Sequence, residues 1–210
     1  MTAQPQPPLP QTLLQMGGAP LHPSPLDAAV LVIVDAQREY ASGRLPLHGI
    51  DAAVAEAGRL LALARQHRVP VIHIVQHSPP GRGLFDETGP MVEILPSLAP
   101  APGEAVITKR LPNAFAGTDL LDRIRATGRR EVILCGFMTH MCISATARAA
   151  LDLGLRATVV AAATATRDIA DPLGGVVPAE VVHRTALAEL ADRFAIVVPD
   201  TAALTAEPVP

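Results

Sequence analysis

The chain alternates short runs of β-branched residues with longer segments rich in alanine and leucine. The first run, Val-Leu-Val-Ile-Val at 30–34, is apolar at every position, whereas a strand with one face in water alternates apolar and polar residues. Strands buried on both faces are typical of parallel sheets, whose crossover connections are usually helices. The alternation therefore predicts an α/β protein, a three-layer α/β/α sandwich around a mostly parallel sheet of about six strands.

The same pattern assigns the elements and the domain boundaries. We interpret residues 1–25, rich in proline and glycine, as an N-terminal arm with a short helical turn at 12–16, and residues 26–210 as a single domain. We expect strands at 30–35, 69–76, 104–108, 131–135, 156–161 and 195–198, and helices at 49–67, 118–127, 139–153 and 179–193.

Composition excludes several classes of partner. Hydrophobic residues make up 49% of the chain, yet no uncharged apolar stretch reaches the roughly 18 residues that a membrane span requires. A net charge of −3 without any basic run gives no electrostatic basis for binding nucleic acid or an anionic membrane, so we expect a small-molecule partner. Two cysteines make no disulfide framework, and the N-terminus lacks the pattern of a secretory signal, so we expect a cytoplasmic protein.

Chemically useful side chains follow the predicted strands. Asp35 ends the first, Gln76 and His77 end the second, Lys109 follows the third, and Cys142 lies beyond the fourth. In an open parallel sheet ligands bind at the carboxyl ends of the strands. There a carboxylate can take a proton from a thiol, and an ammonium group can stabilise the anions that form. A cysteine in the first turn of a helix also faces unpaired N–H groups and the positive end of the helix dipole, which favours the thiolate.

Each residue also has a structural interpretation. Cys142 can be a small packed residue at a junction, Asp35 can cap a turn, and Lys109, beside Arg110, can be a solvated loop residue. Only their coincidence at one edge of the sheet favours catalysis.

Four motifs in order resemble the isochorismatase-like cysteine hydrolases, and the likeness extends from about residue 29 to 199. They are Val-Ile-Val-Asp-Ala-Gln at 32–37, the lysine segment at 107–120, the Cys-Gly-Phe-Met-Thr-His-Met-Cys segment at 135–148, and the last helix and strand at 183–195.

The resemblance implies a hydrolase in which Cys142 is the nucleophile, Asp35 the general base and Lys109 the third member of a catalytic triad. It also implies an oxyanion hole from the backbone N–H groups of Met138 and Cys142, with a cis peptide bond between Phe137 and Met138. A homodimer or homotetramer, in which the N-terminal arm is exchanged between subunits, is a further expectation.

A second group of residues is expected to bind substrate. It consists of Gln37, His77, Phe115, Phe137 and His140, with core or loop packing as the alternative for each. His73 and His77, four apart on one strand, are conceivable metal ligands. The nicotinamidase branch of the family binds metal through Asp-x-His, however, and Val75 stands at the aspartate position here. We therefore expect no metal site and no cofactor.

Three functions remain open. The first is hydrolysis of a C–N bond in a small amide, ureido or carbamoyl compound through an acyl-enzyme on Cys142. The second is acid-catalysed cleavage of a vinyl ether, as in true isochorismatases, which tend to have glycine at the position of Cys142. The third is a catalytically inactive binding or assembly module that keeps only the fold.

Overall fold

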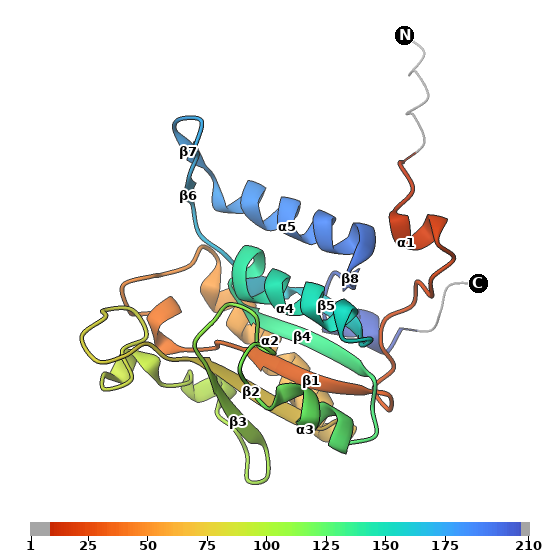
Figure 1. Ribbon diagram of the computed structural model, residues 1–210, viewed down its shortest axis with the longest axis horizontal. Coiled ribbons are helices and arrows are strands. Elements are labelled where there is room, and N and C mark those ends of the chain that lie inside the picture. The colour runs from red at the N-terminus through yellow and green to blue at the C-terminus, as the bar shows by residue number, and fades with distance from the viewer. Residues whose placement is uncertain (1–8, 207–210) are drawn as a thin grey trace.

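Six parallel strands form the central sheet of the computed structural model, which describes residues 9–206 (Figure 1). The strand order is β3-β2-β1-β4-β5-β8, and every neighbouring pair is parallel. The strands are β1 (Ala29–Val34), β2 (Val71–Gln76), β3 (Ala105–Lys109), β4 (Glu131–Phe137), β5 (Arg156–Ala165) and β8 (Ile196–Val198). The predicted parallel α/β sheet is confirmed.

Helices cover both faces of the sheet. They are α2 (Ile50–Gln66), α3 (Leu120–Ala126), α4 (Ser144–Asp152) and α5 (Ala179–Arg193), preceded by the short α1 (Leu13–Met16). The α2 helix packs against one face, whereas α3, α4 and α5 pack against the other. Successive β1 side chains alternate between the two cores, and all six are buried. Neither face of β1 meets water, and this explains why every residue of the strand is apolar.

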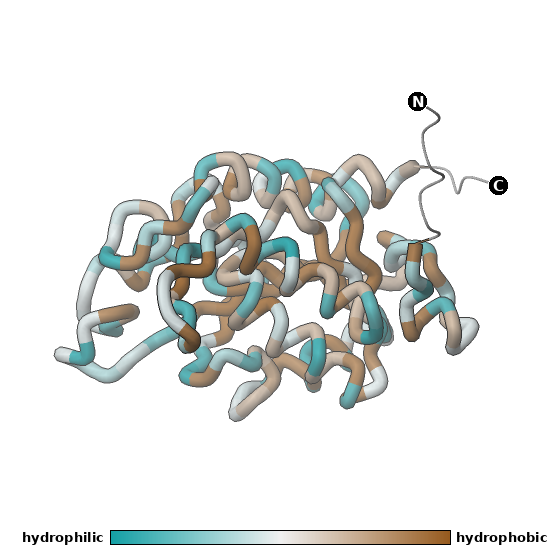
Figure 2. Tube along the Cα trace, turned by 90° about the horizontal axis from the view of Figure 1, so that it is seen from above, coloured by the Kyte–Doolittle hydropathy of each residue, from teal (hydrophilic) through white to brown (hydrophobic). Residues whose placement is uncertain are grey.

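Apolar burial holds the α2 helix in place. Ala53, Ala57, Leu60 and Ala64 recur at helical spacing, and each is at most 3% exposed. Figure 2 shows the same separation across the molecule, with hydrophobic segments running through its middle and hydrophilic segments frequent at its outside. Truncation of a buried leucine such as Leu60 to alanine costs about 2–5 kcal/mol in proteins generally. None of the helices within residues 9–206 combines the length and apolar character needed to cross a bilayer.

The structure differs from the predicted elements after β4. The predicted helix at 139–153 begins instead as a π-helical turn, Thr139–Ile143, before α4 starts. The β5 strand runs on to Ala165, beyond the predicted end at 161, because a bulge lets its alanine-rich end pair with Gly136 and Phe137. A hairpin of β6 (Ile169–Ala170) and β7 (Val176–Val177), which was not predicted, then leads into α5.

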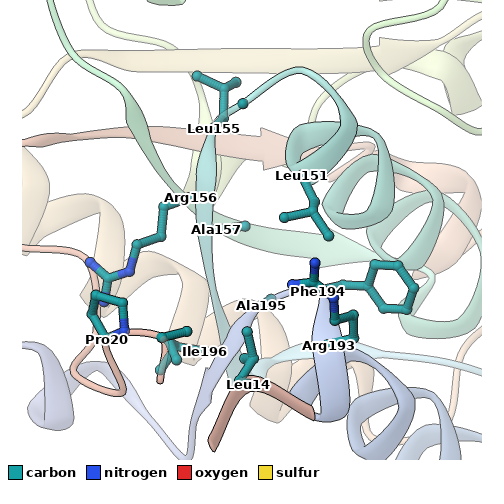
Figure 3. A pocket seen from close by; sticks show the side chains of 12 residues that line it. Leu14, Pro20, Leu151, Leu155, Arg156, Ala157, Arg193, Phe194, Ala195 and Ile196 are labelled. Carbon is teal, nitrogen blue, oxygen red and sulfur yellow. The ribbon is translucent and has the colours of Figure 1, made fainter. Parts of the chain in front are cut away.

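The described part of the predicted arm packs against the last helix, whereas residues 1–8 lie outside the described residues. The N–H of Leu13 in α1 donates to Asp192 Oδ1 at 3.0 Å. A cavity of about 290 Å³ lies under the arm, lined by residues that include Leu14, Leu155 and Phe194 (Figure 3). It borders the first residues of β5 and β8. The cavity therefore lies at the amino-terminal ends of the strands, whereas Asp35 and Lys109 lie at their carboxyl ends.

Candidate active site

Three strand ends bring Asp35, Lys109 and Cys142 to one point. Asp35 directly follows β1, Lys109 is the last residue of β3, and Cys142 lies in the π-helical turn after β4. The Nζ atom of Lys109 is 2.7 Å from Asp35 Oδ2 and 3.4 Å from Cys142 Sγ. The long lysine side chain reaches across β2, which separates β3 from β1 in the sheet. The structure thus places the predicted carboxylate, ammonium and thiol in mutual contact.

Three groups surround the ammonium group of Lys109. It forms the ion pair with Asp35, and it donates to Gln76 Oε1 at 2.7 Å and to Cys142 Sγ at 3.4 Å. Lys109 is only 1% exposed, and a buried ammonium group needs such partners to offset the loss of its hydration.

Burial dominates the electrostatics of Asp35. It raises the pKa of the carboxyl group, and the adjacent Lys109 charge opposes that rise. The carboxylate is therefore a stronger base than an aspartate in water, and the positive charge of Lys109 favours its ionised form. The backbone at Asp35 has a φ of 52°, in the left-handed region, which aspartate tolerates better than most residues.

Cys142 does not rest as the thiolate that the helix-start argument predicted. Burial, and then the negative charge of Asp35, raise the pKa of the Cys142 thiol to about 12. That prediction was wrong because sequence spacing revealed the helix start but not the carboxylate facing the sulfur. Nucleophilic attack by this thiol would first require loss of its proton, and the carboxylate of Asp35 is a base close enough to accept it.

The backbone before Cys142 is shaped for close approach. Gly136 has a φ of 112°, and a Cβ there would lie 2.0 Å from the carbonyl oxygen of Val34 in β1. The peptide bond between Phe137 and Met138 is cis, as predicted. Among residues 9–206, the N–H of Met138 donates to no other group, whereas its carbonyl accepts from Met141 and Ile143. A backbone N–H without a partner, in the segment that leads into the turn of Cys142, is the kind of donor that an oxyanion hole uses.

Two of the predicted substrate-binding residues are engaged inside the protein. The side-chain amide of Gln37 donates to the carbonyls of Gln76 and Val92 at 3.0 and 2.7 Å, and it accepts from the Gln76 N–H. Phe137 is fully buried, and its ring lies 5.8 Å from that of Tyr40. Neither side chain therefore has its polar group or ring surface free in this structure.

The other three lie at the protein surface around the strand ends. His77 and Phe115 are half-buried. His140 is half-buried too, and its Nδ1 lies 2.5 Å from Thr166 Oγ1. His73 instead contacts Glu104, 3.0 Å from its Nε2. In the part of the chain that the structure describes, no group of three or more histidine, cysteine or acidic residues is arranged to hold a metal ion.

Sequence reasoning did not assign Gln76 a role in the site. Gln76 was noted at a strand end, but only the sheet register, in which it pairs with Lys109, places its side chain beside the ammonium group.

A buried carboxylate, ammonium and thiol at the carboxyl ends of a parallel sheet, beside a free backbone N–H, define the class of α/β/α cysteine hydrolases. Comparison with known proteins agrees with this class. The isochorismatase domain family matches residues 29–201, and the chain belongs to that family. The resemblance inferred from the four motifs is therefore confirmed.

Individual relatives extend this assignment. The chain is 38% identical to a secreted isochorismatase effector of Verticillium dahliae, over 87% of this chain and 94% of the relative. It is 35% identical to a maleamate amidohydrolase of Pseudomonas putida, over 62% of this chain and 68% of the relative. The crystal structure of an isochorismatase from Pseudomonas putida KT2440 superposes with a TM-score of 0.88 at 44% identity, covering 93% of this chain and all of the other.

Proposed function

We propose that the protein hydrolyses a C–N bond in a small amide, ureido or carbamoyl compound through an acyl-enzyme on Cys142. The contact of Lys109 Nζ with both Asp35 Oδ2 and Cys142 Sγ carries the proposal, because it joins a base, a cation and a nucleophile in one buried site. The amidohydrolase among the relatives supports C–N bond cleavage.

The proposed reaction has two halves. Asp35 takes the proton of Cys142 as the sulfur attacks the carbonyl carbon, and the N–H groups of Met138 and Cys142 bind the resulting oxyanion. Asp35 then returns the proton to the leaving nitrogen, which departs as ammonia or an amine and leaves a thioester. Water, deprotonated by Asp35, attacks the thioester, and the acid and the free thiol are released. Lys109 stabilises the negative charge on the carboxylate and sulfur throughout.

Ammonia release from a panel of small amides and carbamoyl compounds tests the proposal. Cys142→Ala is expected to abolish turnover, and intact-protein mass spectrometry is expected to detect an acyl adduct on the wild type alone. Cys135→Ala is a matched control, because Cys135 is buried in β4 outside the triad. Normal turnover by Cys142→Ala would refute the acyl-enzyme, and an inactive, unlabelled wild type would favour the inactive module.

A second candidate is vinyl ether cleavage of the isochorismatase type. The 38% identity to the secreted isochorismatase effector favours it. Protonation of a vinyl ether needs an acid and no thiol, so this activity would survive Cys142→Ala but not Asp35→Asn. Pyruvate release from isochorismate by the two variants separates the candidates.

The remaining expectations are part of the same proposal. We propose one catalytic domain at 26–210 that acts without a cofactor, in a homodimer or homotetramer, and in the cytoplasm. The free thiols of Cys135 and Cys142 suit a reducing compartment. Sedimentation velocity measures the oligomeric state directly.

A further inference from the structure

Three arginines line one hollow at the amino-terminal end of the sheet. The hollow has a volume of about 300 Å³, and Arg125, Arg129 and Arg130 supply its charged side chains. Arg125 lies in the last turn of α3, and the other two directly precede β4. Among residues 9–206, none of the three forms an ion pair with a carboxylate. No direct partner therefore balances their positive charges.

Negative groups around this hollow are too few to cancel three guanidinium charges. The carbonyl ends of α3 and α4 border it, and each helix end is equivalent to only about half a negative charge. Glu131 is already paired with Arg156, at 2.7 Å between Oε2 and Nη1. Asp122 and Asp152 are the acids of α3 and α4, and both are exposed to solvent and do not line the hollow. The hollow therefore keeps an excess of positive charge.

The cavity beneath the N-terminal arm adjoins this basic hollow. Gly154 and Leu155 line both of them. Among the described residues, a Cβ on Gly154 would have no neighbouring atom within 4 Å, so the space beside the shared glycine is open. The two hollows therefore lie side by side, and no side chain of residue 154 divides them.

The cavity beneath the arm is lined mainly by apolar side chains. Leu14 comes from the arm, Leu151 from α4 and Ile196 from β8, and Figure 3 shows them around one space. All three are half-buried. Arg156 also borders the cavity, but its guanidinium donates to the carbonyl oxygen of His22. An apolar cavity of about 290 Å³ suits a hydrocarbon group, because water finds few hydrogen-bond partners there.

We propose that the two hollows form one binding site for a free amphipathic anion, a small molecule with an anionic head group and a short hydrocarbon tail. The head group lies against Arg125, Arg129 and Arg130, since guanidinium groups pair with the oxygens of a phosphate or carboxylate. The tail passes Gly154 and fills the apolar cavity beneath the arm. This site is at the opposite end of the strands from the triad, so it is separate from the site of the proposed hydrolysis.

Alkyl phosphates of increasing length test the proposal in the full-length protein. Isothermal titration calorimetry is expected to show saturable binding of octyl phosphate below the concentration at which it forms micelles. The affinity is expected to rise about fourfold for each methylene from butyl to octyl phosphate, the effect of burying one methylene group. Octanol has the tail without the charge, and inorganic phosphate has the charge without the tail. Each should bind at least tenfold more weakly than octyl phosphate.

Variants separate the contributions of the head group and the tail. Arg125→Gln and Arg130→Gln should each weaken octyl phosphate binding about three- to fivefold, because both side chains are exposed and contribute as surface charges do. The double variant should weaken it about tenfold, and none of these changes should affect octanol. Leu14→Gln in the arm should reduce the gain in affinity per methylene. Arg184→Gln, on α5 and outside both hollows, is the matched control and should bind as the wild type does.

Three results would overturn the proposal. They are the absence of saturable octyl phosphate binding, equal affinities for octyl phosphate and octanol, and the same loss of affinity in Arg184→Gln as in Arg130→Gln. A membrane lipid offers similar chemistry, so the protein is also sedimented with phosphatidylglycerol vesicles and is expected to stay in the supernatant. Binding to vesicles without binding to octyl phosphate would refute a site for a free ligand. Circular dichroism identifies any unfolded variant, in which case the series of chain lengths in the wild type decides.

Discussion

Replacement of Lys109 by methionine is expected to remove activity and to destabilise the fold through one cause, the loss of the charge beside Asp35. At the 2.7 Å separation of Nζ and Oδ2, the two charges attract by about 6 kcal/mol at an effective dielectric constant of 20. Without that attraction, burial raises the pKa of Asp35 further, and the carboxyl group stays protonated. A protonated Asp35 cannot accept the proton of Cys142, so we expect kcat/KM to fall by about 10³-fold or more.

The stability of the same variants distinguishes an ion pair from two independent residues. Removal of one partner of a buried pair costs about 3–5 kcal/mol, whereas replacement of both by neutral residues is often close to neutral. Lys109→Met and Asp35→Asn should therefore each be less stable than the double variant, although all three are inactive.

The loss of folding stability in Lys109→Met depends on pH through the same carboxyl group, that of Asp35. In this variant the folded-state pKa of Asp35 lies above its unfolded-state value, so the folded protein holds a proton that the unfolded chain releases as the pH rises. The deficit is therefore largest at neutral and alkaline pH and shrinks in acid.

Urea unfolding followed by circular dichroism suits these measurements, because the chain has no tryptophan and one tyrosine. Ammonia release reports activity in parallel. If the double variant loses the sum of the two single losses, Asp35 and Lys109 do not interact, and the reasoning is refuted.

Three other outcomes are expected. The rate of Cys142 alkylation by iodoacetamide should keep rising past pH 9.0, the ordinary thiol pKa, because its own pKa is about 12; a plateau near neutral pH would contradict the burial argument. Gly136→Ala should lower the unfolding free energy by about 3 kcal/mol or more, since its φ and its contact with β1 both exclude a side chain, and a urea midpoint equal to that of the wild type would disprove this. Gln76→Leu removes an acceptor from Lys109 and should lower kcat by about 5- to 150-fold, checked by steady-state ammonia release; an unchanged kcat would make Gln76 dispensable.

The sheet could be predicted from the sequence because the signal lies in the residues of each strand itself. Strand β1 has no polar residue, and only a strand covered on both faces has that composition. The end of β5 could not be predicted, because alanine has little preference for strands and the pairing depends on a bulge beside Gly136.

Asp35, Lys109 and Cys142 could be chosen as candidates from their positions after strands, but the pKa values of these groups could not be predicted. The high pKa of the Cys142 thiol depends on Asp35, which is remote in sequence and adjacent in space. Gln37 is a similar case. Its amide is occupied by the backbone at Val92, and nothing in the sequence places that loop beside it. Residue spacing in the sequence cannot identify interaction partners that only the tertiary structure brings together.

The order of strands in the sheet has a consequence for synthesis on the ribosome. Strands β1, β2 and β3 are made first and can pair with one another, which brings Asp35 and Lys109 together while the other edge of β1 is still open. That edge is apolar and lacks hydrogen-bond partners until β4 emerges, so the nascent chain passes through an aggregation-prone stage. The thiol arrives only with the segment that closes this edge. A chain that is truncated or stalled before β4 can therefore bring Asp35 and Lys109 together but lacks Cys142.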